Sequence, residues 1–162
     1  MPTLHLMVGL PGSGKTTEAK RLAIQNNAVR LTPDEWQHKL FGNDFVPGED
    51  NSEHDRRHTA IEEIMRNLAC ELLNCGTDVI LDFGFWAKEE RDELRTLANS
   101  IGADFQIHYM ACDIDELWRR LQKRNLQSGE LPVFRVGRAE LEAWSKVFEP
   151  PLEEELEDCS GK

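Results

Sequence analysis

The sequence has few cysteines, and their spacing argues against a structural zinc site. The four cysteines are Cys70, Cys75, Cys112 and Cys159, and none of them forms a C-x-x-C pair or follows the ligand spacing of a zinc site. The natural interpretation is that these are free thiols, which persist in a reducing compartment. We therefore expect a cytoplasmic protein.

Long apolar runs are also missing. No window approaches the roughly 18 uncharged apolar residues that a transmembrane helix needs. The first residues show no basic region followed by an apolar run, so we expect no signal peptide. Apolar residues still make up 40% of the 162 residues, which is enough for the core of one globular domain.

Positive charge is scarce as well. There are 19 lysines and arginines against 30 aspartates and glutamates, so the formal net charge is −11. General binding to DNA or RNA relies on basic side chains that neutralise phosphates, so the composition predicts no general nucleic-acid binding and disfavours a polynucleotide substrate. An anionic membrane surface is disfavoured for the same reason. A basic cluster nevertheless survives at Arg119, Arg120, Lys123 and Arg124.

The most informative stretch that is present is Gly9–Thr17. Gly9, Gly14, Lys15 and Thr16 fit the Walker A pattern G-x-x-x-x-G-K-T of a phosphate-binding P-loop. Its glycines let backbone N–H groups point at one anion, the lysine reaches the β- and γ-phosphates, and the threonine hydroxyl ligates Mg²⁺. A glycine-rich turn that binds nothing fits less well, because an apolar run precedes the motif and a helical pattern follows it. The predicted nucleotide-binding residues are Gly9, Pro11, Gly12, Ser13, Gly14, Lys15, Thr16 and Thr17.

Strand and helix patterns alternate along the rest of the chain. Apolar runs predict strands at residues 4–8, 28–31, 78–82 and 105–110, and helical periodicity separates them. This alternation predicts an α/β fold in which helices cover both faces of a parallel sheet. Right-handed crossovers then place the carboxyl ends of the strands on the side of the P-loop.

Local signals add detail to these helices. Thr32, Pro33 and Glu35 predict a capping box at the start of the helix that carries Trp36. Apolar helix faces predict that Trp36, Trp118 and Trp144 lie in the core.

Two carboxylates are expected at the P-loop edge of the sheet. Asp82 ends an apolar strand, where it can hold Mg²⁺ directly or through water; capping the next segment is the alternative. Asp34 follows the second strand by three residues. It can take the proton of an attacking hydroxyl, or it can simply favour the dipole of the helix that it begins. Spacing alone does not decide between these two roles.

Two arginines form a second candidate group. Arg120 and Arg124 are four residues apart and project from one helix face, where paired guanidinium groups suit a phosphoryl group. A flanking loop with Gly129 allows this helix to close as a lid, and a solvated amphipathic helix is the alternative. His54 and His58 have i, i+4 spacing but lack the glutamate of H-E-x-x-H, so zinc is not expected there.

With these residues located, the chain resembles P-loop kinases of the small bacterial type. This group includes phage polynucleotide kinase, chloramphenicol phosphotransferase and the zeta toxins, and the chain is most similar to bacterial AAA-family ATP-binding proteins. The matching segments are residues 9–17, 30–36, 80–86, 118–125 and 148–151, within a resemblance that covers residues 1 to about 151. The resemblance implies the three-layer P-loop nucleoside triphosphate hydrolase fold. It also implies that Asp34 activates the acceptor and that Arg120 and Arg124 belong to a lid over ATP.

We therefore expect a P-loop kinase-like domain over residues 1–151, with a lid around 113–137 and a disordered acidic tail over 152–162. Relatives usually continue into a fifth strand after the lid, whereas an acidic sequence follows here. The predicted activity moves the γ-phosphate of ATP, with Mg²⁺, to a hydroxyl of a small molecule, and acceptor specificity is expected in residues 41–57 and 83–86. A regulatory or switch NTPase without such an acceptor is the alternative. The predicted catalytic residues are Lys15, Asp34, Arg120 and Arg124, and the predicted metal ligands are Thr16 and Asp82.

Overall fold

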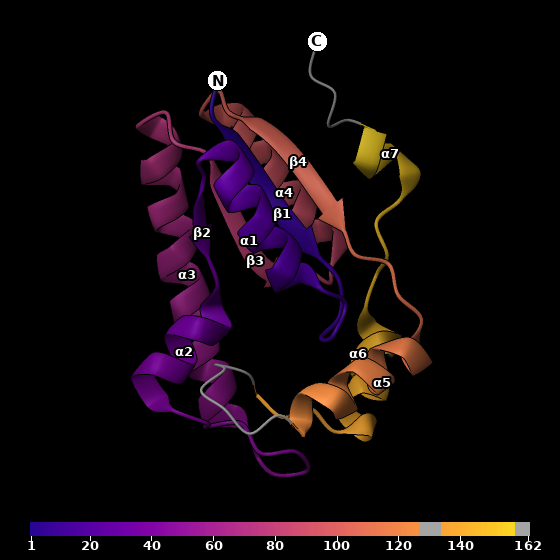
Figure 1. The fold of residues 1–162 in the computed structure, drawn as a ribbon. Coiled ribbons are helices and arrows are strands. Elements are labelled where there is room, and N and C mark those ends of the chain that lie inside the picture. Colours follow the sequence, from indigo (N-terminus) through magenta and orange to yellow (C-terminus); the bar gives the residue numbers. More distant parts are fainter. Residues whose placement is uncertain (127–133, 158–162) are drawn as a thin grey trace.

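The computed structural model describes residues 1–126 and 134–157, and it shows a parallel sheet between helices (Figure 1). The strands are β1 (Thr3–Val8), β2 (Val29–Leu31), β3 (Val79–Gly84) and β4 (Asp104–Tyr109), in the order β2-β3-β1-β4. The helices are α1 (Lys15–Asn26), α2 (Pro33–Phe41), α3 (Ser52–Asn74), α4 (Lys88–Ser100), α5 (Ile114–Asn125), α6 (Arg138–Val147) and α7 (Glu153–Glu157). All three strand pairings are parallel. The predicted α/β class and parallel sheet are confirmed.

The two faces of the sheet follow from the alternation of side chains along each strand. In β1, Leu4, Leu6 and Val8 are buried in one cluster with apolar residues of α3 and α4. Met7 points to the opposite face, where it packs with Ala19 and Leu22 of α1. Helices therefore cover both faces, and α1 starts at the carboxyl end of β1, where the P-loop was expected.

A second, smaller apolar cluster holds α5 and α6 together. Leu117 and Leu121 of α5 are buried against Leu141 of α6 and Leu10 of the P-loop. In Figure 1 these two helices lie beyond the carboxyl ends of the strands, away from the sheet. The segment expected to act as a lid thus packs on the P-loop side of the molecule. Gly129, its expected hinge, lies outside the described residues.

The expected capping box at the start of α2 does not form. Thr32 occupies the N-cap position, but its hydroxyl makes no capping hydrogen bond and instead donates to Asp82 Oδ2 at 3.1 Å. The Glu35 carboxylate is paired with the Arg30 guanidinium at 2.9 Å. A charged guanidinium is a stronger partner for the Glu35 carboxylate than a backbone N–H. Thr32 and Glu35 therefore bind side chains of β3 and β2 instead of capping α2.

Trp36 also differs from its prediction, because its side chain is 38% exposed. The helix α2 is short, and its buried positions are Pro33 and Gln37 rather than Trp36. Trp144 does pack in the α5–α6 cluster, where its ring lies 5.6 Å from that of Trp86.

The acidic tail is more ordered than its composition predicted. Glu153–Glu157 form α7, and Glu155 is only 4% exposed. Its carboxylate accepts from Arg91 Nε at 2.8 Å and from Leu152 N at 2.8 Å, while Arg91 is itself 1% exposed. One buried ion pair therefore anchors a segment in which a run of like charges indicated disorder. Residues 158–162 of the expected tail lie outside the described part of the chain.

Candidate active site

The P-loop connects β1 to α1, as the motif requires. Gly14 is the N-cap residue of α1 with φ 94°, and Gly12 has φ 85°, so both occupy backbone conformations that favour glycine. A Cβ on Gly12 would come within 3.0 Å of Leu121 Cγ and 3.2 Å of the Leu117 carbonyl. The loop can therefore lie against α5 only because this position has no side chain.

Lys15 and Thr16 occupy the first turn of α1. The Lys15 ammonium donates to the Leu10 carbonyl at 3.0 Å, across the P-loop. Desolvation lowers the pKa of Lys15, and the nearby charges of Asp82 and Asp34 oppose that effect. The helix N-terminus, the glycine turn and this cation together form a site that suits a polyphosphate.

Asp82 lies directly beside the P-loop, near the end of β3. Its Oδ2 accepts from the Thr16 hydroxyl at 2.8 Å, and burial raises its pKa. Its Oδ1 is buried and has no hydrogen-bond partner. A carboxylate and a hydroxyl with one unsatisfied buried oxygen are the hard oxygen ligands that Mg²⁺ prefers, so these residues fit that ion.

Asp34 lies in the first turn of α2, and 58% of its side-chain surface is exposed. Its Oδ1 lies 3.0 Å from Nε2 of His58, and Nδ1 of that histidine lies 3.3 Å from Glu62 Oε1. Desolvation pushes the pKa of Asp34 up, but the hydrogen bond and charge of His58 outweigh it, and the pKa is lowered. His58 shows the complementary change, since its two acidic partners overcome its burial and raise its pKa.

The basic cluster on α5 divides into two pairs. Arg120 lies near the P-loop, with Nη1 3.5 Å from the Ser13 carbonyl, and Arg124 Nη2 donates to the Phe134 carbonyl at 3.1 Å. The Arg124 Nε is buried without a hydrogen-bond partner. Arg119 and Lys123 do not line the pocket described next. The i, i+4 prediction therefore selects the two arginines that face the P-loop.

One pocket of about 550 Å³ brings these groups together. Lys15, Asp34, Asp82, Arg120 and Arg124 all line it, although they come from four different elements, α1, α2, β3 and α5. The other lining residues predicted to bind nucleotide are Pro11, Gly12, Gly14, Thr16 and Thr17. A phosphate-binding loop and a separate carboxylate therefore open into the same space.

Two polar residues that line the pocket were given other roles from the sequence. Thr32 was interpreted only as a helix cap, yet its hydroxyl binds Asp82. His58 was considered only as half of a zinc pair with His54, but the two rings have different partners, namely Asp34 and Asp44. A usable signal was present, because His58 and Glu62 are again four residues apart on α3.

Comparison with known proteins places the chain in a family. The family described as AAA domain matches residues 4–151. This chain belongs to the AAA domain family. No curated protein is similar enough to the AAA domain described here to count as a match. The matched range includes the P-loop, both carboxylates and the two arginines.

Solved structures share the fold of this AAA domain at low sequence identity. Pnkp1 in a Pnkp1/Rnl/Hen1 RNA repair complex has a TM-score of 0.70 and 22% identity, over 90% of this chain and 43% of its own. A gluconokinase from Sinorhizobium meliloti has a TM-score of 0.60 and 18% identity, over 94% and 78%. Kti12 from Chaetomium thermophilum, in complex with ADP-AlF3, has a TM-score of 0.69 and 17% identity, over 92% and 81%. The AAA domain thus spans less than half of the Pnkp1 chain that it matches.

These neighbours share the α/β P-loop fold of this chain, and the family match spans the residues that line the pocket. They also correct one expectation, since exclusion of nucleic-acid partners on the basis of net charge is contradicted by the likeness to a component of an RNA repair complex. Net charge averages over the whole surface, whereas one pocket collects four cations and four carboxylates: Lys15, Lys20, Arg120 and Arg124 with Asp34, Glu35, Asp55 and Asp82. Overall acidity is therefore a poor guide to what this pocket binds. Among the described residues, no helix is long and apolar enough to cross a membrane.

Proposed function

We propose that this protein is a phosphotransferase that moves the γ-phosphate of ATP to a hydroxyl group of its acceptor. The observation that carries the proposal is the position of Asp34, which lies outside the P-loop and the Thr16–Asp82 pair but lines the same pocket as Lys15. A second carboxylate is of little use to an enzyme that only binds nucleotide. It can take the proton that the attacking hydroxyl of an acceptor has to lose.

In this proposal the triphosphate lies on the P-loop, with its end near Lys15. Thr16 and Asp82 would hold Mg²⁺, which would supply positive charge to balance the phosphates. Lys15, Arg120 and Arg124 balance the charge that develops on the transferred group. The fold similarity to Kti12, which was solved with ADP-AlF3, is consistent with a nucleotide at this position.

The chemical step has a simple balance. The acceptor oxygen forms a new bond to the γ-phosphorus while the bond from that phosphorus to the β,γ-bridging oxygen breaks, and ADP leaves. The acceptor proton passes to the Asp34 carboxylate. His58 is a positioning residue, because its contacts with Asp34 and Glu62 fix the orientation of the carboxylate and keep it ionised. We further propose that residues 113–137 act as the lid and that the reaction takes place in the cytoplasm.

An Asp34→Asn variant tests the role of this carboxylate. We expect transfer to fall by about 10²–10⁴-fold, which is the usual contribution of a general base, with ATP affinity little changed. The measurement is ADP release with a panel of acceptors that includes sugars, nucleosides and oligonucleotides with a free 5′-hydroxyl. Asp92→Asn is a matched control, because Asp92 is paired with Lys88 on α4 and does not line the pocket.

The same panel separates the proposal from a regulatory NTPase. A phosphotransferase releases ADP faster in the presence of one class of acceptor, and this stimulation disappears with Asp34→Asn. Release that no acceptor alters, and that Asp34→Asn leaves unchanged, would count against the proposal and favour a switch with water as its acceptor.

A further inference from the structure

Aromatic side chains connect the P-loop side of the pocket to Asp34. The ring of Trp86 lies 5.6 Å from that of Trp144, and the ring of Trp144 lies 6.0 Å from that of Phe45. The centroid of the Phe134 ring lies 6.5 Å from that of the Phe45 ring. All four residues line the pocket. We refer to Phe45, Trp86, Phe134 and Trp144 as the aromatic wall.

The two ends of the aromatic wall meet the reacting groups. A Cβ added to Gly84 would lie within 4 Å of both Trp86 Nε1 and Lys15 Cε. The Trp86 ring is therefore beside the lysine of the P-loop. At the other end Phe45 lies 5.1 Å from the His54 ring, which stacks at 5.9 Å on His58, the partner of Asp34. The wall therefore borders the space between the γ-phosphate position and the proposed base.

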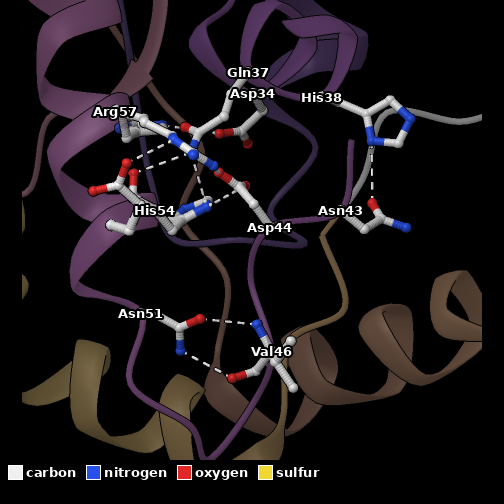
Figure 2. Close-up of polar contacts among 11 residues, drawn as sticks. Asp34, Gln37, His38, Asn43, Asp44, Val46, Asn51, His54 and Arg57 are labelled. Atoms are coloured by element: carbon white, nitrogen blue, oxygen red, sulfur yellow. Dashed lines mark hydrogen bonds and ion pairs between the residues drawn. The ribbon is translucent and has the colours of Figure 1, made fainter. Parts of the chain in front are cut away.

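Polar contacts fix the two residues that flank Phe45 in the sequence, Asp44 and Val46 (Figure 2). Before Phe45, Asp44 accepts hydrogen bonds from Gln37 Nε2 at 3.1 Å and from Arg57 Nη1 at 3.2 Å, and its Oδ1 lies 2.8 Å from His54 Nδ1. After Phe45, the backbone N–H and carbonyl of Val46 both bond to the Asn51 amide, at 2.8 and 2.9 Å. Phe45 is thus presented on a backbone fixed at both neighbouring residues.

This loop is also tied to α6, which carries Trp144. The Gly48 N–H donates to Glu140 Oε1 at 2.7 Å. The loop after α2 and the helix α6 therefore place their aromatic rings together, although about a hundred residues separate them in the sequence. A preformed wall of this kind can bind a planar group without a large loss of conformational entropy on binding.

Two arginines near the acceptor side are already paired with carboxylates of the protein. The Arg57 guanidinium is paired with Asp44 and Glu53, and that of Arg30 with Glu35. The cations that line the pocket, Lys15, Lys20, Arg120 and Arg124, belong to α1 and α5 on the P-loop side. The body of the acceptor therefore meets aromatic faces, with the Arg124 guanidinium beside them through its bond to the Phe134 carbonyl at 3.1 Å.

We infer that the acceptor presents a planar aromatic ring next to the hydroxyl that is phosphorylated, and that Phe45 is a specificity-determining residue. This inference rests on the proposed function for the chemistry at the hydroxyl, but the binding of the ring is a separate property of the pocket. A ring of this kind occurs in a free nucleoside or an aromatic alcohol, and also in the terminal base of a nucleic acid. Each source presents a flat π face, which aromatic side chains bind well.

Tryptophan fluorescence tests the inference without any need for turnover, because Trp86 and Trp144 belong to the wall. The full chain, with Mg²⁺ and ADP, is titrated with adenosine, 2-phenylethanol, gluconate, glycerol and a short oligoadenylate with a free 5′-hydroxyl. We expect saturable quenching with ring-bearing probes only. Phe45→Ala should weaken the binding of these probes by about tenfold, because it removes one aromatic contact. Leu40→Ala, at an exposed position of α2 outside the pocket lining, should not.

The outcomes separate this inference from the proposed function. Saturation by adenosine or 2-phenylethanol indicates that the acceptor is a small free molecule. Saturation by the oligoadenylate alone indicates that the acceptor is the end of a nucleic acid. Either result supports an acceptor with an aromatic ring. Equal binding of gluconate or glycerol, no binding of any ring-bearing probe, or no effect of Phe45→Ala overturns the inference. Ring binding without ADP release keeps the inference and rejects the phosphotransferase. Transfer to gluconate alone rejects the inference and keeps the phosphotransferase.

Discussion

A carboxylate that accepts a proton has to be ionised before the acceptor arrives, and His58 meets this requirement for Asp34. The two side chains are 3.0 Å apart, and the contact lowers the pKa of Asp34 while it raises that of His58. Asp55, Glu62 and Asp34 face His58 with negative charge, whereas Lys15 and Arg124 act on Asp34 from the P-loop side. The contact therefore favours the ionised carboxylate of Asp34 and the protonated ring of His58.

This pairing gives a pH prediction with a definite sign. With His58 present, Asp34 stays ionised below its ordinary pKa of 3.8, so its protonation does not limit turnover in mildly acidic solution. His58→Gln removes the positive partner and leaves desolvation in place, so the pKa of Asp34 rises. We expect the acidic limb of the pH–rate profile to move to higher pH in this variant.

The matched control for that profile is His38→Gln, because His38 bonds Asn43 on the surface and does not line the pocket. NMR titration of the Asp34 carboxyl carbon, assigned with Asp34→Asn, measures the same shift without a substrate. An unchanged profile and an unchanged carboxyl titration in His58→Gln would show that this histidine has no role beyond packing.

At the scale of helices and strands, α7 illustrates what periodicity cannot reveal. Glu155 belonged to an acidic tail that was expected to be disordered, and no sequence pattern singled out Arg91. In the structure they form a buried pair, with Arg91 Nη1 also donating to the carbonyls of Phe85 and Glu149, each at 3.0 Å. Phe85 has φ 44° and lies directly after β3, so this arginine fixes the turn that leads to Trp86.

Removal of one partner of the Arg91–Glu155 pair should lower the stability of the fold. Glu155→Ala leaves the Arg91 charge buried without its carboxylate, and such changes cost about 3–5 kcal/mol in the free energy of unfolding. Glu154→Ala, in the same helix but at an exposed position, should change stability by less than about 0.5 kcal/mol. Urea denaturation of both variants measures the difference. Equal loss in the two would mean that the buried pair does not anchor the tail.

The elements that were predictable share a feature, which is that their signal lies within a short stretch of sequence. The P-loop spacing and the apolar runs around Leu6 and Ile80 specify the strands and α1 locally. Thr32, Glu35 and Glu155 were misinterpreted because each was given a local role, whereas their partners Asp82, Arg30 and Arg91 lie elsewhere in the fold. Contacts between separate elements determine the role of such side chains, and no local sequence pattern encodes these contacts.

At the scale of the whole molecule, the topology brings the site together. Because all strands are parallel, the segments after β1, β2 and β3 meet at one edge of the sheet. The packing of α5 against the P-loop then adds two arginines to that edge. Sequence order predicted this meeting of segments, but it did not predict the aromatic wall, which depends on how the loop after α2 packs against α6.

The central claim is that the turn after β1 binds the phosphates of ATP, and calorimetric titration of the purified chain with ATP and Mg²⁺ tests it directly. We predict measurable binding, with a Kd in the range of about 1 µM–1 mM. Lys15→Ala should weaken it by about tenfold or more, since it removes a charge-assisted contact, while Lys39→Ala on the exposed surface of α2 should leave it unchanged. Absence of binding to the wild-type chain, or equal binding by wild type and Lys15→Ala, would contradict the account.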